Sequence, residues 1–182
     1  MAGNYNDRAF APWILPRALN DGECDALEEA ARRLPRAAGA VISLPDDYRR
    51  CSAASFRRDP EWLYSKIWDI FDAANQVFKF SIIGLNEPVH HFLYGVDDGF
   101  DWHSDCGPGL TATRKLSLSI QLSNEYGYEG GDLEFHLPLS CVEVRNRGTA
   151  IIFPAFLPHR VTKIVSGERA SLVSWACGPT FV

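Results

Sequence analysis

The stretch RGTAIIFPAFLPHRVTKIVSGERASLVSW, residues 147–175, predicts the fold class more clearly than any other part of the chain. Three short segments, at 150–153, 159–164 and 171–175, have the buried or period-two pattern of apolar residues that strands show, and glycine or proline lies between the segments. Short apolar runs separated by turn residues are typical of strands in an antiparallel sandwich or barrel. We therefore expect three short strands here.

The same pattern continues towards the N-terminus. Runs with strand-like patterns occupy 80–85, 90–94, 116–122, 133–136 and 142–144, and the Gly-Gly pair at 130–131 favours a hairpin or bulge. With the C-terminal stretch they make about eight strands. We expect a mostly β fold, a jelly-roll or double-stranded β-helix core of antiparallel sheets.

Two helices are predicted before these strands. An Asn-Asp pair at 20–21 supplies the first N-cap, apolar residues recur at helical spacing through CDALEEAARRL, and Pro35 ends the helix. The second helix starts at DPE, residues 59–61, with Asp59 as its N-cap, and runs to about Phe78. Both helices should buttress one sheet.

Length and composition are those of one soluble globular domain. The 182 residues are 46% hydrophobic and 23% charged. We expect a single domain over 1–182, with support helices and strands over 1–80 and the jelly-roll core, which carries the functional site, over 81–182. Residues 13–15 favour a short strand, and residues 1–12 a loosely held arm.

Charge and cysteine content narrow the possible partners and compartment. A net charge of −5 disfavours a dedicated nucleic-acid binder. No apolar run reaches the roughly 18 residues that span a bilayer, and the N-terminus lacks the pattern of a secretory signal. The five scattered cysteines contain no CxxC pair and fit reduced thiols. We expect a cytoplasmic protein that binds neither nucleic acid nor membrane; the sequence leaves the oligomeric state open.

A candidate metal site lies in DWHSDCG, residues 101–107. His103 and Asp105 are two positions apart, and side chains at i and i+2 of an extended strand share a face. An imidazole and a carboxylate can then meet at one first-row divalent metal. His159, 54 residues after Asp105, is the best candidate for a third ligand. Taken alone, the pair also fits a surface histidine beside a turn aspartate.

Arg169 and Ser171, which follow His159 in the sequence, indicate what such a metal would be used for. Arg169 follows that histidine by ten residues, and Ser171 lies two further on, on the same face of a strand. Two imidazoles and one carboxylate on Fe(II) leave open positions, which a bidentate 2-oxoacid and dioxygen can fill. The planar guanidinium of Arg169 matches the far carboxylate of a dicarboxylic co-substrate, and Ser171 adds a hydroxyl donor.

The segment 91–180 resembles the Fe(II)/2-oxoglutarate-dependent dioxygenases, most of all their prolyl 4-hydroxylase branch with the bacterial PKHD-type hydroxylases. The resemblance rests on HFLYGVDDGFDWHSD, LSLSIQLSNEYGYEGGDLEFH and RGTAIIFPAFLPHRVTKIVSGERASLVSW. It covers about half of the chain, and the N-terminal half is similar only in its layout.

The resemblance implies roles and cofactors. His103, Asp105 and His159 are the implied iron ligands, and Arg169 with Ser171 binds the distal carboxylate of 2-oxoglutarate. The resemblance also implies that Tyr94 lines the co-substrate pocket, that Gln121 stands where animal prolyl hydroxylases carry a tyrosine, and that Trp175 flanks the site. Trp102 and Asp101, next to the first proposed ligand in the sequence, are further candidates for residues near the substrate. The implied cofactors are Fe(II), 2-oxoglutarate as co-substrate, O₂ and ascorbate.

The implied activity is hydroxylation of an unactivated C–H bond in a prolyl or other residue of a protein or peptide, with release of succinate and CO₂. A free amino acid or small metabolite is the alternative substrate, and a non-catalytic jelly-roll binding module the alternative function. An AlkB-type demethylase of nucleic acids would carry a second arginine where this chain has Trp175. A cupin-type metal enzyme without 2-oxoglutarate would leave Arg169 without a task.

Several other polar residues fit more than one interpretation. A basic cluster supplies either solvated edge-strand charges or contacts to an acidic substrate: Arg49, Arg50, Arg57 and Arg58. Three further histidines are expected to pack rather than to bind metal: His90, His91 and His136. Three aspartates near the site are expected to shape a turn, with contact to a substrate at the mouth of the site as the alternative: Asp97, Asp98 and Asp101.

Overall fold

The computed structural model describes residues 10–38, 49–136 and 144–181. Most of the predicted N-terminal arm, Cys141 and most of the strand predicted for 142–144 lie outside the described residues.

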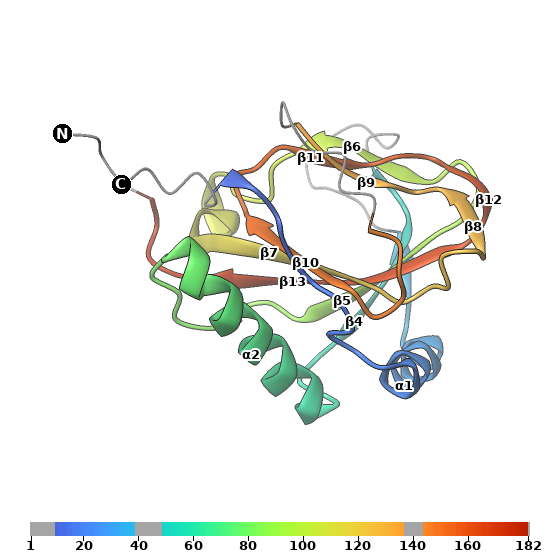
Figure 1. Ribbon diagram of the computed structural model, residues 1–182, viewed down its shortest axis with the longest axis horizontal. Coiled ribbons are helices and arrows are strands. Elements are labelled where there is room, and N and C mark those ends of the chain that lie inside the picture. The colour runs from blue at the N-terminus through green and yellow to red at the C-terminus, as the bar shows by residue number, and fades with distance from the viewer. Residues whose placement is uncertain (1–9, 39–48, 137–143, 182) are drawn as a thin grey trace.

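Three antiparallel sheets make up the β part of the chain (Figure 1). The strands of the large sheet are, in spatial order, β1 (Trp13–Leu15), β10 (Ala150–Pro154), β7 (Arg114–Gln121), β13 (Arg169–Cys177), β5 (Val89–Tyr94), β4 (Ser52–Phe56) and β2 (Ala37–Ala38). Those of the second sheet are β3 (Arg49–Arg50), β6 (Gly99–His103), β11 (His159–Val161) and β9 (Leu133–Phe135). The third sheet pairs β12 (Ile164–Gly167) with β8 (Tyr128–Gly130).

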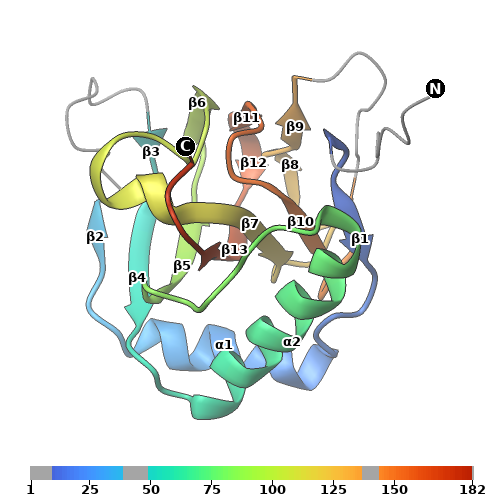
Figure 2. The same ribbon diagram turned by 90° about the vertical axis from the view of Figure 1, so that its left-hand side faces the viewer.

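Two helices, α1 (Asp21–Arg32) and α2 (Glu61–Phe78), cover one face of the large sheet (Figure 2). Asn20 caps α1 in a capping box with Glu23, as its side-chain chemistry favours. The N-cap of α2 is Pro60, so the predicted Asp59 cap is wrong by one residue; Pro60 keeps an extended ψ of 142° and stays outside the helix.

The predicted strand at 80–85 is not formed. This segment touches the sheet through one isolated bridge, Gly84 to Cys177. Its apolar residues alternate because Phe80, Ile82 and Leu85 pack on the core while Ile83 is 69% exposed. One-sided packing of an extended segment gives the same period of two as a strand does, without a neighbour to pair with.

The predicted strand at 159–164 is divided in two. Its first part, β11, pairs with β6 and β9 in the second sheet, whereas Ile164 begins β12, which pairs with β8. The chain therefore changes sheets at residues 162–163. The short strand β8 and the separate strand β6 were not predicted as such.

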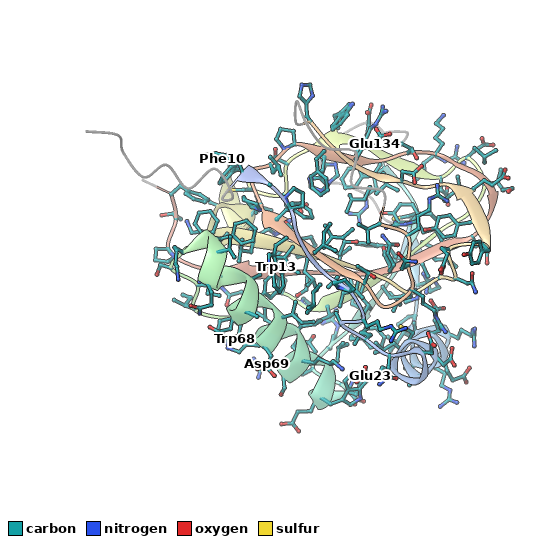
Figure 3. The ribbon with its side chains drawn as sticks, in the orientation of Figure 1. Phe10, Trp13, Glu23, Trp68, Asp69 and Glu134 are labelled. Carbon is teal, nitrogen blue, oxygen red and sulfur yellow. The ribbon has the colours of Figure 1, made fainter. Side chains whose placement is uncertain are left out.

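Alternation along the strands of the large sheet produces two hydrophobic cores. Ala170, Leu172 and Ala176 of β13 face the helices and join the first core, which also holds Ile67 and Phe71 of α2. Trp13 of β1 packs against this core, in the space between α2 and the sheet (Figure 3). A second core contains residues of β5, β9, β10 and β11. The mostly β jelly-roll with two supporting helices is thus confirmed.

Gly148, just before β10, lies where no larger residue fits. Its φ is +76°, and an added Cβ would stand 2.0 Å from the carbonyl oxygen of Leu19. We expect Gly148→Ala to lower the free energy of unfolding by about 2–5 kcal/mol, because it adds a left-handed backbone penalty to an overpacking penalty. Urea unfolding followed by circular dichroism measures this loss.

Gly109 offers a matched control, because its φ is +74° and nothing lies within 4 Å of an added Cβ. Gly109→Ala should therefore cost only the backbone penalty, about 1–2 kcal/mol. Equal losses in the two variants would contradict the contact with Leu19.

Candidate metal centre

Three predicted ligands from different parts of the chain meet at one point. His103 ends β6, His159 begins β11, and the two face each other in the antiparallel register of these strands. Asp105 follows β6 by two residues, outside the strand. One ligand atom of each of the three residues lies within 4.8 Å of the other two. Among the described residues, this is the group of histidine, cysteine and acidic side chains that is arranged to hold a metal ion.

Backbone carbonyls orient both imidazoles. Nδ1 of His103 donates to the carbonyl oxygen of Asp101 at 2.7 Å, and Nδ1 of His159 donates to that of Leu157 at 2.9 Å. These bonds fix the tautomer, because a carbonyl only accepts. Each Nε2 is then a free lone pair, 3.8 Å and 3.6 Å from the Asp105 carboxylate oxygens. Metal-binding histidines are commonly held in this way.

A second set of residues positions Asp105. Ser117 on β7 donates its hydroxyl to Asp105 Oδ2 at 2.6 Å. Arg114 donates to the Asp105 carbonyl oxygen at 3.2 Å, is held by Glu87 through Nε at 2.6 Å, and stacks 3.6 Å above the Trp175 ring. The sequence carried no signal for Ser117, Arg114 and Glu87, because their roles depend on contacts between distant segments.

Burial and neighbouring groups shift the pKa values of His103 and Asp105. Burial, and next the interaction with His159, lowers the pKa of His103 to about 4. Burial would raise the pKa of Asp105, but its electrostatic interactions with His159 and His103 and the Ser117 hydrogen bond outweigh burial, and that pKa is lowered. The neutral imidazole and ionised carboxylate that a metal requires are therefore the favoured forms at neutral pH.

The pKa of His103 predicts a loss of stability in mild acid for the metal-free protein. Between pH 6.5 and about 4 the His103 imidazole is protonated in the unfolded chain but stays neutral in the folded chain. The free energy of unfolding therefore falls as the pH falls through this window. At pH 5 we expect the loss relative to pH 7 to be about 2 kcal/mol. Urea unfolding at the two pH values measures it. His103→Gln removes the titrating group, so an equal loss in parent and variant would refute the assignment.

The three ligands border a cavity of about 730 Å³, lined by residues of both larger sheets. The large sheet supplies the side chains that alternate with its helix-facing residues: Arg169, Ser171, Val173 and Trp175 from β13, and Phe92 and Tyr94 from β5. Along β13, the even-numbered apolar residues therefore lie in the first core, and the odd-numbered residues from 169 to 175 line the cavity.

Arg169 is the charged side chain that most clearly requires a ligand. It is 1% exposed, and its Nη1 lies 3.5 Å from Ser171 Oγ. Its Nε and Nη2 have no partner among the described residues. Its guanidinium stands 5.6 Å from the Tyr94 ring centre, and burial raises the Tyr94 pKa to about 12, so the phenol stays a donor. An unpaired buried guanidinium is costly unless an anion binds it; a carboxylate fits this site.

The remaining predicted residues lie at different distances from the cavity. Gln121 is buried opposite Ser171 in the β7–β13 pairing, and its side-chain oxygen has no partner among the described residues. Trp102 contacts His136 and the Arg160 guanidinium and does not line the cavity. Asp101 is exposed and contributes only its backbone carbonyl. Arg160 pairs with Glu134, on the side of the molecule away from the helices (Figure 3).

The other histidines and the aspartates at 97–98 have structural partners. His91 lies 3.5 Å from Glu28, and His90 contacts Ser55 and stacks on Phe92. Asp98 accepts a hydrogen bond from the backbone of Gly95, as expected of a turn. No described helix is long and apolar enough to cross a membrane.

Comparisons with known proteins agree with this geometry. Residues 89–177 match the family model described as the 2OG-Fe(II) oxygenase superfamily. A PKHD-type hydroxylase of Synechococcus sp. (strain CC9902) is 38% identical over 91 residues, which cover 48% of this chain and 41% of that relative. The matched part of the chain spans less than half the length of this relative and of two further PKHD-type hydroxylases from Synechococcus, with 41%, 43% and 46% covered.

Two solved structures share the fold. A Pseudomonas putida prolyl-4-hydroxylase superimposes with a TM-score of 0.76 at 18% identity, over 96% of this chain and 97% of that one. A Trichoplax adhaerens prolyl hydroxylase, in complex with a peptide fragment of hypoxia inducible factor, superimposes with a TM-score of 0.73 at 15% identity, over 94% and 84%. At these identities the likeness shows the fold. The match to the family model and the PKHD-type relatives confirm the resemblance drawn from the sequence.

Proposed function

We propose that this chain, whose residues 89–177 belong to the 2OG-Fe(II) oxygenase superfamily, is an Fe(II)- and 2-oxoglutarate-dependent hydroxylase. Its substrate is an unactivated C–H bond in a prolyl or other residue of a protein or peptide. The PKHD-type relatives and the peptide-bound structural neighbour support this substrate class. A free amino acid or small metabolite remains the alternative.

One observation carries the proposal: a metal-binding trio and an unpaired buried arginine border the same cavity. His103 and His159 would hold Fe(II) through Nε2, and Asp105 through its carboxylate. A mixed nitrogen and oxygen donor set with three protein ligands suits ferrous iron and leaves positions for exchangeable ligands. A closed structural zinc site would require a fourth protein ligand.

Arg169 would bind the distal carboxylate of 2-oxoglutarate. Its free Nε and Nη2 form the fork that pairs with a carboxylate through two parallel hydrogen bonds. The protonated Tyr94 phenol and the Ser171 hydroxyl are further donors on the same side of the sheet. Gln121 lies opposite Ser171 and can offer its amide NH₂ where the animal enzymes carry a tyrosine.

When bound, iron and 2-oxoglutarate would supply O₂ activation: one oxygen atom would convert C–H to C–OH, and the other would oxidise 2-oxoglutarate to succinate and CO₂. The chain supplies orientation and a largely dry cavity. Phe92, Phe153 and Val161 give it apolar walls that exclude water and hold the substrate carbon close to the metal. Ser117 and Arg114 keep Asp105 in place and so fix the orientation of a proposed metal ligand.

We also propose that residues 1–182 act as one domain, because the helices support the sheet that carries Arg169.

Succinate release tests the proposal. The protein is incubated with Fe(II), 2-oxoglutarate, O₂ and ascorbate, with and without pools of proline-containing peptides or free amino acids. We expect succinate and a product heavier by one oxygen atom, and the pool that yields it identifies the substrate class. Zn(II) in place of Fe(II) should give neither product. A binding module without catalysis would give no succinate under any of these conditions, and that result would overturn the proposal.

A further inference from the structure

Arg49 is the member of the basic cluster that lines the cavity. Its neighbour Arg50 turns away and lies 3.7 Å from Asp98. Arg57 and Arg58 are exposed. The cluster predicted from the sequence is therefore not one surface: Arg50, Arg57 and Arg58 are solvated surface charges, and Arg49 belongs to the site.

Two aromatic rings hold the Arg49 guanidinium. Its carbon stands 4.0 Å from the centre of the Phe92 ring and 4.8 Å from that of Phe100. Its Nε is buried and has no hydrogen-bond partner among the described residues. Stacking on ring faces fixes the plane of a guanidinium but leaves its N–H groups free to donate. Arg49 is thus preorganised to bind something planar and negatively charged.

Every other charged group of the cavity already has a task. Glu87 is paired with Arg114, and Asp105 faces the two imidazoles. Arg169 is the more buried cation, and the proposed function assigns it the co-substrate. No described acidic side chain forms an ion pair with Arg49. Among the described residues that line the cavity, the Arg49 guanidinium is therefore the cation that is available to bind a second anion.

The position of Arg49 places that anion near the reacting carbon. Phe100 contacts the Arg49 guanidinium and also stacks on the His103 imidazole, with ring centres 3.4 Å apart. A single aromatic ring therefore separates the guanidinium from a proposed iron ligand. If a substrate carbon were held at the metal, the chemical groups nearest to that carbon would lie within reach of Arg49. Distant parts of a protein substrate would not.

We propose that Arg49 selects substrates with a carboxylate next to the carbon that is hydroxylated. This inference rests on the proposed function and adds a specificity-determining residue to it. The carboxylate has two possible sources: the α-carboxylate of a free amino acid, or the side chain of an aspartate or glutamate adjacent to the target residue in a peptide. Both would accept charge-assisted hydrogen bonds from the same guanidinium.

Calorimetry on the Zn(II) form of the protein, saturated with 2-oxoglutarate, separates binding from turnover. The first set of probes is the N-acetylated amino acids, each as the free acid and as its primary amide. The second set is the tetrapeptides Ac-Ala-X-Asp-Ala-NH₂ and Ac-Ala-X-Asn-Ala-NH₂, with X varied. We expect the acidic member of a binding pair to bind about tenfold to a hundredfold more tightly, and the set in which this occurs identifies the source of the carboxylate.

Arg49→Met should bring this ratio close to one, because it keeps the apolar stem between the rings and removes the donors. Arg49→Lys keeps the charge without the planar fork and should retain part of the preference. Arg50→Met is the matched control: it removes the same charge from the same strand and should leave the ratio as in the parent protein.

The outcomes distinguish this inference from the function on which it rests. Failure of the Zn(II) form to bind 2-oxoglutarate would overturn both. Three outcomes, each together with normal binding of 2-oxoglutarate, would overturn the inference alone. They are equal affinities for acid and amide, no binding of either set of probes, and a preference for the acid that persists in Arg49→Met. If Arg49→Met instead weakens 2-oxoglutarate binding and leaves the preference unchanged, Arg49 serves the co-substrate, and the inference also fails.

Discussion

Asp105→Ala should abolish turnover of 2-oxoglutarate and weaken metal binding by more than about 100-fold, because loss of a group that merely supports a ligand already costs 10–100-fold. Asp105 is the single carboxylate of the trio, and its charge offsets part of the charge of the metal. It also lies within 4 Å of both Nε2 atoms, so its removal leaves two imidazoles that hold a metal weakly. Zn(II) titration of the metal-free protein measures affinity, and succinate release measures turnover.

Asp101→Ala is the control for this variant. It removes an exposed carboxylate from the same segment and keeps the backbone carbonyl that orients His103. Its Zn(II) affinity should equal that of the parent protein, and circular dichroism should show that both variants are folded. A normal Zn(II) affinity in Asp105→Ala would show that the trio is not the metal site.

Arg169→Ala should raise the concentration of 2-oxoglutarate needed for half-maximal turnover by about 30-fold to 4,000-fold, while kcat at saturation falls much less. Truncating one partner of a buried, hydrogen-bonded charge pair costs about 2–5 kcal/mol, and each 1.4 kcal/mol is tenfold. Arg169 is not one of the three proposed metal ligands, so the metal affinity should be retained. Initial rates of succinate release over a range of co-substrate concentrations separate the two constants.

Lys163→Ala removes one positive charge from an exposed position directly before β12 and should leave both constants unchanged. Arg169→Lys keeps the buried charge but not the fork, and should fall between parent and alanine variant. An unchanged 2-oxoglutarate requirement in Arg169→Ala would refute the co-substrate assignment.

The fold could be predicted well where the signal is local. The helical spacing of the apolar residues of α1 and its Asn20 cap depend on neighbours within one or two turns, and both were found in the sequence. The strand predictions failed where pairing was decided elsewhere: residues 80–85 have the period of a strand but meet no partner along their length, and residues 159–164 change sheets in the middle. Periodicity reports which side of a segment is buried, and it does not report what lies beside it.

The sequence by itself determined which residue types stand at which spacings: His103 and Asp105 two apart, His159 far behind, and Arg169 and Ser171 on one strand face. Only the tertiary structure decided that β6 and β11 pair so that the two imidazoles face each other. It also decided that Ser117 supports Asp105, and that Arg49, but not Arg50, points into the cavity. Side-chain spacing along one strand follows from local backbone geometry, whereas contacts between segments depend on register and on the packing of sheets, which no local pattern encodes.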